Sequence, residues 1–124
     1  MIAGIGIDLI ETERVAEKIA KEGGFREYVF SESEIQYCES KTNKAENYAA
    51  RFAAKEALLK AIGTGMMGNF VFNEMEIATD DMGKPSFNFT GGSKILMDSR
   101  KYSNIMVSLS HLKGIACAMV VIEL

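Results

Sequence analysis

Apolar and polar residues alternate along the first stretch of the chain, IAGIGIDLIE at residues 2–11, which predicts a β-strand. One face of this strand carries apolar side chains, and we expect that face to be buried: Ala3, Ile5, Ile7 and Leu9. The opposite face carries two glycines and then a carboxylate, Asp8. An acid in an otherwise apolar first strand needs a chemical explanation.

After the first strand, the apolar residues recur at helical spacing in three segments. Thr12 is expected to cap a helix that ends at the glycine pair 23–24, and SESE at 31–34 has the capping-box spacing of a second helix. Residues 44–63 are rich in Ala, Leu, Lys and Glu and end on a glycine at a C-cap position. They predict the longest helix of the chain.

The second half of the chain predicts two β-hairpins separated by a short helix: strands at 70–78 and 86–90 around the turn DDMGKP, a helix at 93–102, and strands in NIMVSLSH and IACAMVVIEL. Ser93 is expected to cap that helix. The chain has one proline and no internal repeat. These patterns indicate a single α+β domain over residues 1–124, with an antiparallel sheet packed against a long helix and shorter helices.

Net charge and cysteine spacing exclude several classes of function. A net charge of -3 argues against binding nucleic acid through its phosphates. The first strand contains an acid and lacks a basic leader, so we expect neither a signal peptide nor a membrane span. Cys38 and Cys117 have no CxxC spacing, and His111 is the single histidine, so we expect a reduced cytoplasmic protein without structural zinc.

Two carboxylates, Asp8 and Glu56, interrupt apolar patterns in different elements. At 100° per residue, Glu56 falls within about 40° of the apolar stripe of its helix. Taken singly, Asp8 fits a turn former and Glu56 fits the edge of a core. Taken together, they suit a hard cation such as Mg²⁺, which accepts carboxylates, waters and substrate phosphates. Gly4 and Gly6 would leave room beside such a site.

Other polar groups have two interpretations each. Lys60 lies one turn beyond Glu56, and the glycines of GTGMMG at 63–68 either end the helix or bring backbone amides to an oxyanion. Neither a dinucleotide-binding motif nor a P-loop is present. His111 ends a strand, where it is either structural or a catalytic base. A basic stripe of Arg14, Lys18 and Lys21 is either a solvated face or a surface for an acidic protein.

Four segments of the chain are familiar when taken together. GIGIDLIE, RFAAKEALLKAIGTG at 51–65, GKP at 83–85 and VSLSH at 107–111 resemble, in this order, the holo-acyl-carrier-protein synthase family, the small trimeric 4'-phosphopantetheinyl transferases. The resemblance implies the 4'-phosphopantetheinyl transferase fold, assembled as a homotrimer with sites between protomers.

The resemblance also implies a reaction. The phosphopantetheine arm of coenzyme A passes to a serine of apo acyl carrier protein in fatty acid biosynthesis, with Mg²⁺, and adenosine 3',5'-bisphosphate is released. Asp8 and Glu56 would be the metal ligands, and Lys60 would neutralise the phosphate under attack. The serine proton would pass either to Glu56 or to a metal-bound water.

The same resemblance assigns binding residues. Those expected to hold coenzyme A are Arg51, Lys60, Gly63, Thr64, Gly65, Lys84, Pro85, Ser110 and His111. Arg51, the GKP turn and His111 would reach it from the neighbouring subunit. The stripe Arg14, Lys18 and Lys21 would dock the carrier protein.

Two other classes of function remain open from the residues alone. The first is a non-catalytic α+β oligomer whose basic helix binds an acidic protein. The second is a small metal-dependent phosphohydrolase, which would release phosphopantetheine into water without a carrier serine.

Overall fold

The computed structural model describes residues 1–64 and 68–124. The elements follow one another in the order β1 (Ile2–Glu11), α1 (Thr12–Ala20), α2 (Phe25–Val29), α3 (Glu32–Glu39), α4 (Lys44–Ile62), a 3₁₀ turn η1 (Phe72–Glu74), β2 (Met75–Thr79), β3 (Pro85–Phe89), α5 (Gly91–Arg100), β4 (Asn104–Leu112) and β5 (Ile115–Glu123). The predicted α+β class is confirmed.

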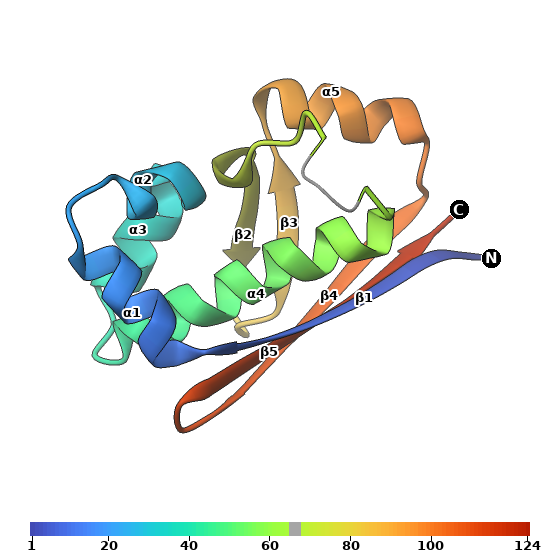
Figure 1. The fold of residues 1–124 in the computed structure, drawn as a ribbon. Helices are drawn as coiled ribbons and strands as arrows, with labels where there is room; N and C mark the ends of the chain where they lie inside the picture. The colour runs from blue at the N-terminus through green and yellow to red at the C-terminus, as the bar shows by residue number, and fades with distance from the viewer. Residues whose placement is uncertain (65–67) are drawn as a thin grey trace.

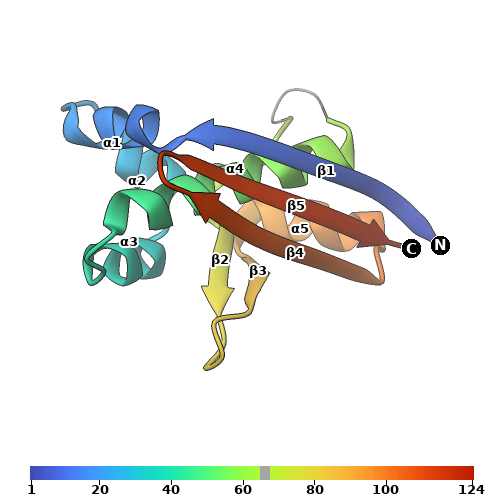
Figure 2. The ribbon, with the colours of Figure 1, turned by 90° about the horizontal axis from the view of Figure 1, so that it is seen from below.

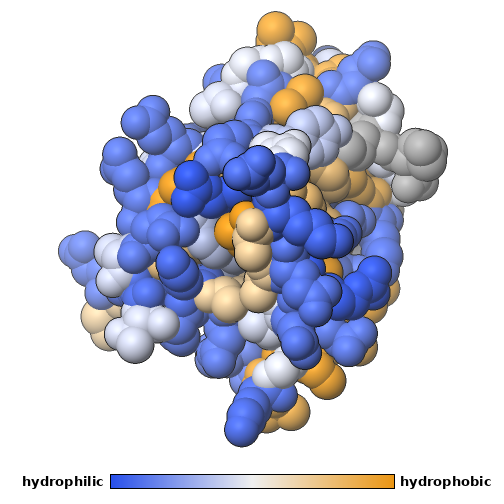
Figure 3. Space-filling view, turned by 60° about the vertical axis from the view of Figure 1, so that its left-hand side comes forward, coloured by the Kyte–Doolittle hydropathy of each residue, from blue (hydrophilic) through white to orange (hydrophobic). Residues whose placement is uncertain are grey.

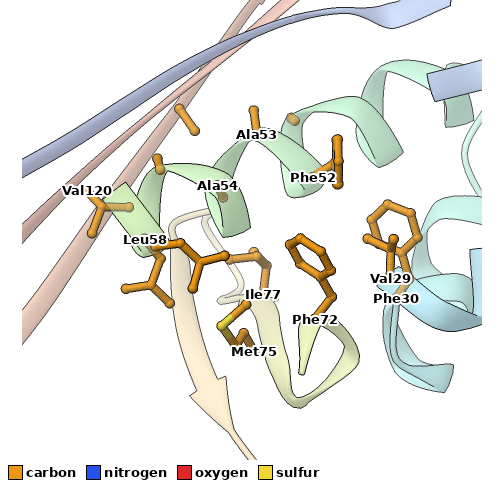
Figure 4. Packing of buried hydrophobic residues seen from close by; sticks show 14 of the residues in the cluster. Val29, Phe30, Phe52, Ala53, Ala54, Leu58, Phe72, Met75, Ile77 and Val120 are labelled. Atoms are coloured by element: carbon orange, nitrogen blue, oxygen red, sulfur yellow. The ribbon is translucent and has the colours of Figure 1, made fainter. Parts of the chain in front are cut away.

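Within these ranges the strands form two antiparallel sheets, one in the order β1-β5-β4 and one that pairs β2 with β3. Helix α4 lies across one face of the three-stranded sheet, and β2, β3 and α5 lie beyond it (Figure 1). Side chains from β2 and from β5 therefore converge on α4 from two sides (Figure 4). Helices α1 to α3 gather around the first half of α4 (Figure 1).

Helix α4 is buried over most of its circumference rather than along one stripe. Its many alanines allow this, because a small side chain lets neighbouring backbones come close on several sides. Gly63 ends the helix with φ of +86°, as predicted from its C-cap position. Among the described helices, none combines the length and the apolar composition that crossing a membrane requires.

The prediction for the buried face of β1 is wrong. Ile5, Ile7 and Leu9 are 57–68% exposed, whereas Gly6 is buried against α4. The glycines explain the reversal. A Cβ at Gly6 would overlap the carbonyl oxygen of Ala57 in α4, and one at Gly4 would overlap that of Ala61. The strand therefore contacts the helix through the face that has no side chains at these two positions.

Two predicted helix caps are also wrong. Thr12 begins the first turn of α1 instead of capping it, and Glu11 occupies the N-cap position without a side-chain hydrogen bond. Ser93 lies inside α5, where its hydroxyl donates to Glu74 Oε1 and accepts from the backbone N–H of Val71, both at 3.0 Å. The hydroxyl of Ser93 therefore makes buried hydrogen bonds near η1 instead of capping the helix.

Other local predictions differ in their boundaries. The capping box at Ser31 and Glu34 is confirmed, with both reciprocal hydrogen bonds present. The strand predicted at 70–78 begins only at Met75, because the preceding residues form the 3₁₀ turn η1. The short helix α2 follows Gly24, whose φ is +78°, and had no clear periodic signal.

The close contact of β1 with α4 predicts a large effect of one methyl group. We expect Gly6→Ala to lower the free energy of unfolding by at least about 2 kcal/mol, because the strand or helix backbone must move. Ala3→Ser, on the exposed face of the same strand, is the control and should change it by less than about 0.5 kcal/mol. Urea unfolding followed by circular dichroism measures both. Equal stability of the two variants would contradict the assigned contact.

Candidate active site

The contact between β1 and α4 places three predicted site residues together. Asp8 follows Gly6 on the face of β1 that meets the helix, and its side chain is 16% exposed. Lys60, in the last turn of α4, donates from Nζ to Asp8 Oδ1 and to the carbonyl oxygen of Ile7, each at 3.0 Å. Glu56 lies one turn earlier on α4 and is half-buried.

Two negative charges interact at this point. Burial raises the pKa of Glu56, and the neighbouring Asp8 carboxylate raises it further, while Lys60 and Lys18 act in the opposite direction. Asp8 and Glu56, the acidic pair, are thus close enough to repel each other although they come from different elements. One lysine hydrogen bond to Asp8 does not cancel this repulsion.

The donor set of the acidic pair fits a hard divalent cation. Two carboxylates with an unfavourable mutual repulsion would be stabilised by a positive ion between them. The described residues contain no group of three or more Asp, Glu, His or Cys side chains arranged for a metal. Water or substrate oxygens would therefore have to complete the coordination, as Mg²⁺ commonly requires.

An open surface hollow lies beside Lys60. Its volume is about 410 Å³, and it is lined by Ile5, Gly6, Ile7, Lys60 and Met119. The lining is largely apolar, so Lys60 stands between a charged group and an apolar surface. Such a hollow is suited to a ligand with a charged part and a less polar part.

The end of α4 holds further predicted residues. Gly63 turns the chain away from the helix beside Lys60. Thr64 follows, and its hydroxyl oxygen is buried without a hydrogen-bond partner in the described part of the chain. Gly65 lies outside the described residues.

Arg51 is placed away from the acidic pair. It is buried, with 3% of its surface exposed, and its guanidinium carbon lies 4.3 Å from the centre of the Tyr37 ring. Lys41 Nζ lies 4.7 Å from the same ring. Arg51 Nε has no hydrogen-bond partner within residues 1–64 and 68–124. Two cations therefore share one ring, and one of them keeps an unused donor.

The remaining predicted ligands of coenzyme A are not joined to the acidic pair in a single chain. Lys84 and Pro85 lie at the β2–β3 turn, which Figure 2 shows beyond β4 on the side away from β1. Ser110 lies on the opposite face of the sheet from Asp8. His111 lies on the same face as Asp8, but at the far strand, where its Nδ1 is 3.2 Å from Glu46 Oε2.

Of the basic stripe, Arg14 and Lys18 lie on α1, whereas Lys21 follows the helix as its extended C-cap residue; all three are exposed. Lys18 and Lys21 border a hollow together with Phe25 and Tyr28, and Lys18 Nζ lies 5.5 Å from the centre of the Phe25 ring. This end of the molecule comes forward in Figure 3, where its surface is mostly hydrophilic. The stripe is therefore available to a partner.

Sequence reasoning missed a buried ion pair between Lys55 and Glu34. Lys55 Nζ lies 2.6 Å from Glu34 Oε1, and both side chains are fully buried. Burial lowers the pKa of Lys55, while Glu34 opposes that shift. The available signal was the position of Lys55, three residues after Phe52 and three before Leu58, on the apolar side of a helix.

Comparison with known proteins identifies the family of the chain. The family model of the 4'-phosphopantetheinyl transferase superfamily matches residues 4–120. The holo-acyl-carrier-protein synthase of Cytophaga hutchinsonii is 47% identical over 122 residues, which cover 97% of this chain and 96% of that protein.

Solved structures agree as well. The holo-acyl-carrier-protein synthase of Neisseria meningitidis has a TM-score of 0.91 at 31% identity, with complete coverage of both chains. That of Bacillus anthracis, solved in complex with coenzyme A (3',5'-ADP), has a TM-score of 0.82 at 35% identity and covers 99% of this chain and 97% of its own. The chain therefore belongs to the 4'-phosphopantetheinyl transferase superfamily, as an enzyme of the holo-acyl-carrier-protein synthase family.

Proposed function

We propose that this protein transfers the 4'-phosphopantetheine arm of coenzyme A to a serine of apo acyl carrier protein, with Mg²⁺, in cytoplasmic fatty acid biosynthesis. The products are holo acyl carrier protein and adenosine 3',5'-bisphosphate. The observation that carries the proposal is the meeting of Asp8, Glu56 and Lys60 where β1 crosses α4. All three lie inside the family match over residues 4–120, and we propose that residues 1–124 form a single domain.

The chemistry assigns a role to each of these side chains. Asp8 and Glu56 would hold Mg²⁺, which would neutralise the pyrophosphate of coenzyme A. Lys60 has a side chain 56% exposed, so it can leave Asp8 for a phosphate oxygen where negative charge develops. The serine oxygen forms a bond to phosphorus as the bond to the departing adenosine bisphosphate breaks. The serine proton would pass either to Glu56 or to a metal-bound water.

A homotrimer would complete the site. The outer face of the three-stranded sheet exposes apolar side chains and is open in Figure 2: Ile5, Ile7, Leu9, Met106, Ile115 and Met119. An apolar patch of this kind is typical of an interface between chains. A neighbouring subunit would then bring Arg51, the GKP turn and His111 to the nucleotide.

The basic stripe supports acyl carrier protein as the second substrate. Arg14 and Lys18 on α1 and Lys21 just after it are exposed in a protein with net charge -3, so they form a local positive surface. An acidic carrier protein is the complementary partner. A binding module alone would need this stripe but not the acidic pair, and a phosphohydrolase would need the acidic pair but not the carrier.

A transfer assay distinguishes these functions. We expect incubation with coenzyme A, Mg²⁺ and apo acyl carrier protein to add the phosphopantetheine mass to the carrier, and EDTA to prevent it. Asp8→Ala should lower kcat/KM roughly 100-fold or more, because a divalent ion contributes several kcal/mol to phosphoryl transfer. Asp98→Ala removes the same charge from exposed α5 and should retain full activity. Mass spectrometry of the carrier is the measurement.

Each failure of this assay has a distinct meaning. Release of free phosphopantetheine with an unmodified carrier would favour the hydrolase. Carrier binding that persists without any transfer in the unmodified protein would favour the binding module.

The proposed interface predicts an effect on assembly. We expect Ile7→Glu to convert the trimer to a monomer and to abolish transfer, since a buried unpaired charge opposes association. Ile95→Glu is the matched control, because Ile95 is 72% exposed on α5, outside the sheet face. Light scattering measures the mass. An active monomer would contradict sites shared between subunits.

The acidic pair predicts a pH-dependent stability in the absence of metal. The folded chain keeps the Glu56 proton to a higher pH than the unfolded chain, so this residue lowers the free energy of unfolding as pH rises above 4.5. Glu56→Gln removes the effect. In EDTA, the variant should gain stability relative to the unmodified protein between about pH 4 and about pH 7. The gain should stay below ~1 kcal/mol because solvent reaches the site. If the free energy of urea unfolding changes with pH in the same way in both proteins, the raised pKa assigned to Glu56 is contradicted.

A further inference from the structure

The buried ion pair between Lys55 and Glu34 has no part in the proposed chemistry, yet its contacts are unusually complete. Lys55 Nζ donates to Glu34 Oε1 and to the carbonyl oxygen of Val29, both at 2.6 Å, and to that of Phe72 at 3.0 Å. All three ammonium protons are therefore used.

The carboxylate of the pair is held equally well. Glu34 Oε1 accepts from the backbone N–H of Ser31 at 3.0 Å, and Oε2 accepts from that of Ile77 at 3.0 Å. The pair thus connects α4 with α2, α3, η1 and β2. Figure 4 shows Val29, Phe72 and Ile77 on the side of α4 that faces away from the three-stranded sheet.

Stability alone is a weak reason for such a pair. Removing two charges from water costs about as much as their attraction returns, and apolar side chains often replace a buried pair without loss. An ion pair with hydrogen bonds also fixes the relative orientation of the elements that it joins, since its hydrogen bonds are satisfied in one geometry only. The pair supplies such a restraint in the fully buried part of α4, in addition to the exposed hydrogen bonds that Lys60 makes to β1.

The buried surface of α4 combines four large apolar side chains, Tyr48, Phe52, Leu58 and Leu59, with many small ones. Much of its buried surface is alanine: Ala49, Ala50, Ala53, Ala54, Ala57 and Ala61. The alanine methyl groups and the glycines of β1 set how closely α4 and β1 approach. Such small groups do not interlock, so this contact opposes rotation of α4 about its axis only weakly. Glu56 follows Lys55 directly, so a rotation that moves one moves the other.

We propose that the ion pair between Lys55 and Glu34 is a positioning device, which fixes the rotation of α4 so that the Glu56 carboxylate faces Asp8. Lys55 is then a positioning residue that acts through Glu56 and does not touch the substrate. The inference rests on the proposed function, because it gives Glu56 the role of a metal ligand.

The test uses the double variant Lys55→Met with Glu34→Gln, which removes both charges and leaves no unpaired buried ion. Met97→Ala, in the core beneath α5, is the control for a general loss of stability. The readout is the dissociation constant of Mn²⁺ in the presence of coenzyme A, measured on the folded protein by electron paramagnetic resonance. Residues that orient metal ligands typically change metal affinity by about 10–100-fold.

We expect the double variant to bind Mn²⁺ at least about tenfold more weakly and to need correspondingly more Mg²⁺ for transfer. Its KM for the carrier should stay unchanged, and Met97→Ala should bind Mn²⁺ as the unmodified protein does. If the double variant does not fold, Glu34→Asp shortens the carboxylate arm with the charges kept, and it should weaken Mn²⁺ binding in the same direction.

Unchanged Mn²⁺ affinity in a folded variant would overturn the inference while the proposed function stands. Failure of the unmodified protein to bind Mn²⁺ or to transfer would instead overturn the proposed function. Equal weakening in Met97→Ala would show that the loss follows stability and would also overturn the positioning role.

Discussion

The close approach of β1 to α4 is the constraint on which the rest of the structure depends. It exists because Gly4 and Gly6 have no side chains where the carbonyl oxygens of Ala61 and Ala57 come near. Strand periodicity then places Asp8, two residues further along, on the same face and at the helix surface. A larger residue at either glycine would separate the backbones and move the Asp8 carboxylate away from α4.

This constraint creates an electrostatic conflict, which identifies the site. Asp8 and Glu56 both lie where solvent is partly excluded, and the Asp8 carboxylate raises the pKa of Glu56. A protein selected for stability alone would place neutral side chains here. Lys60 donates to Asp8 and to the carbonyl oxygen of Ile7, but its side chain is 56% exposed, so a phosphate oxygen can reach its ammonium group. The arrangement is better suited to a bound ion and a phosphate than to the isolated chain.

The sequence predicted most elements and the acidic pair, because these depend on local periodicity and on charges that interrupt it. It misjudged β1, since alternation shows that a strand has two faces but not which face meets the helix. Ile5 and its apolar neighbours suggested the inside, whereas the glycines mark the closer contact. Ser93 and Lys55 were missed for a related reason. Their partners, Glu74 and Glu34, are distant in sequence, and no local pattern reports such pairs.

The two faces of β1 have different tasks, and their alternation links assembly to chemistry. Asp8 points to α4, while Ile7 and Leu9, its immediate neighbours, lie on the open apolar face. A subunit that covers Ile7 would also cover the hollow shared by Ile7 and Lys60. Association would thereby exclude water beside the acidic pair and strengthen the electrostatic interactions within it. In this protein, the exposed apolar face and the buried acid are thus two consequences of one strand whose side chains alternate every second residue.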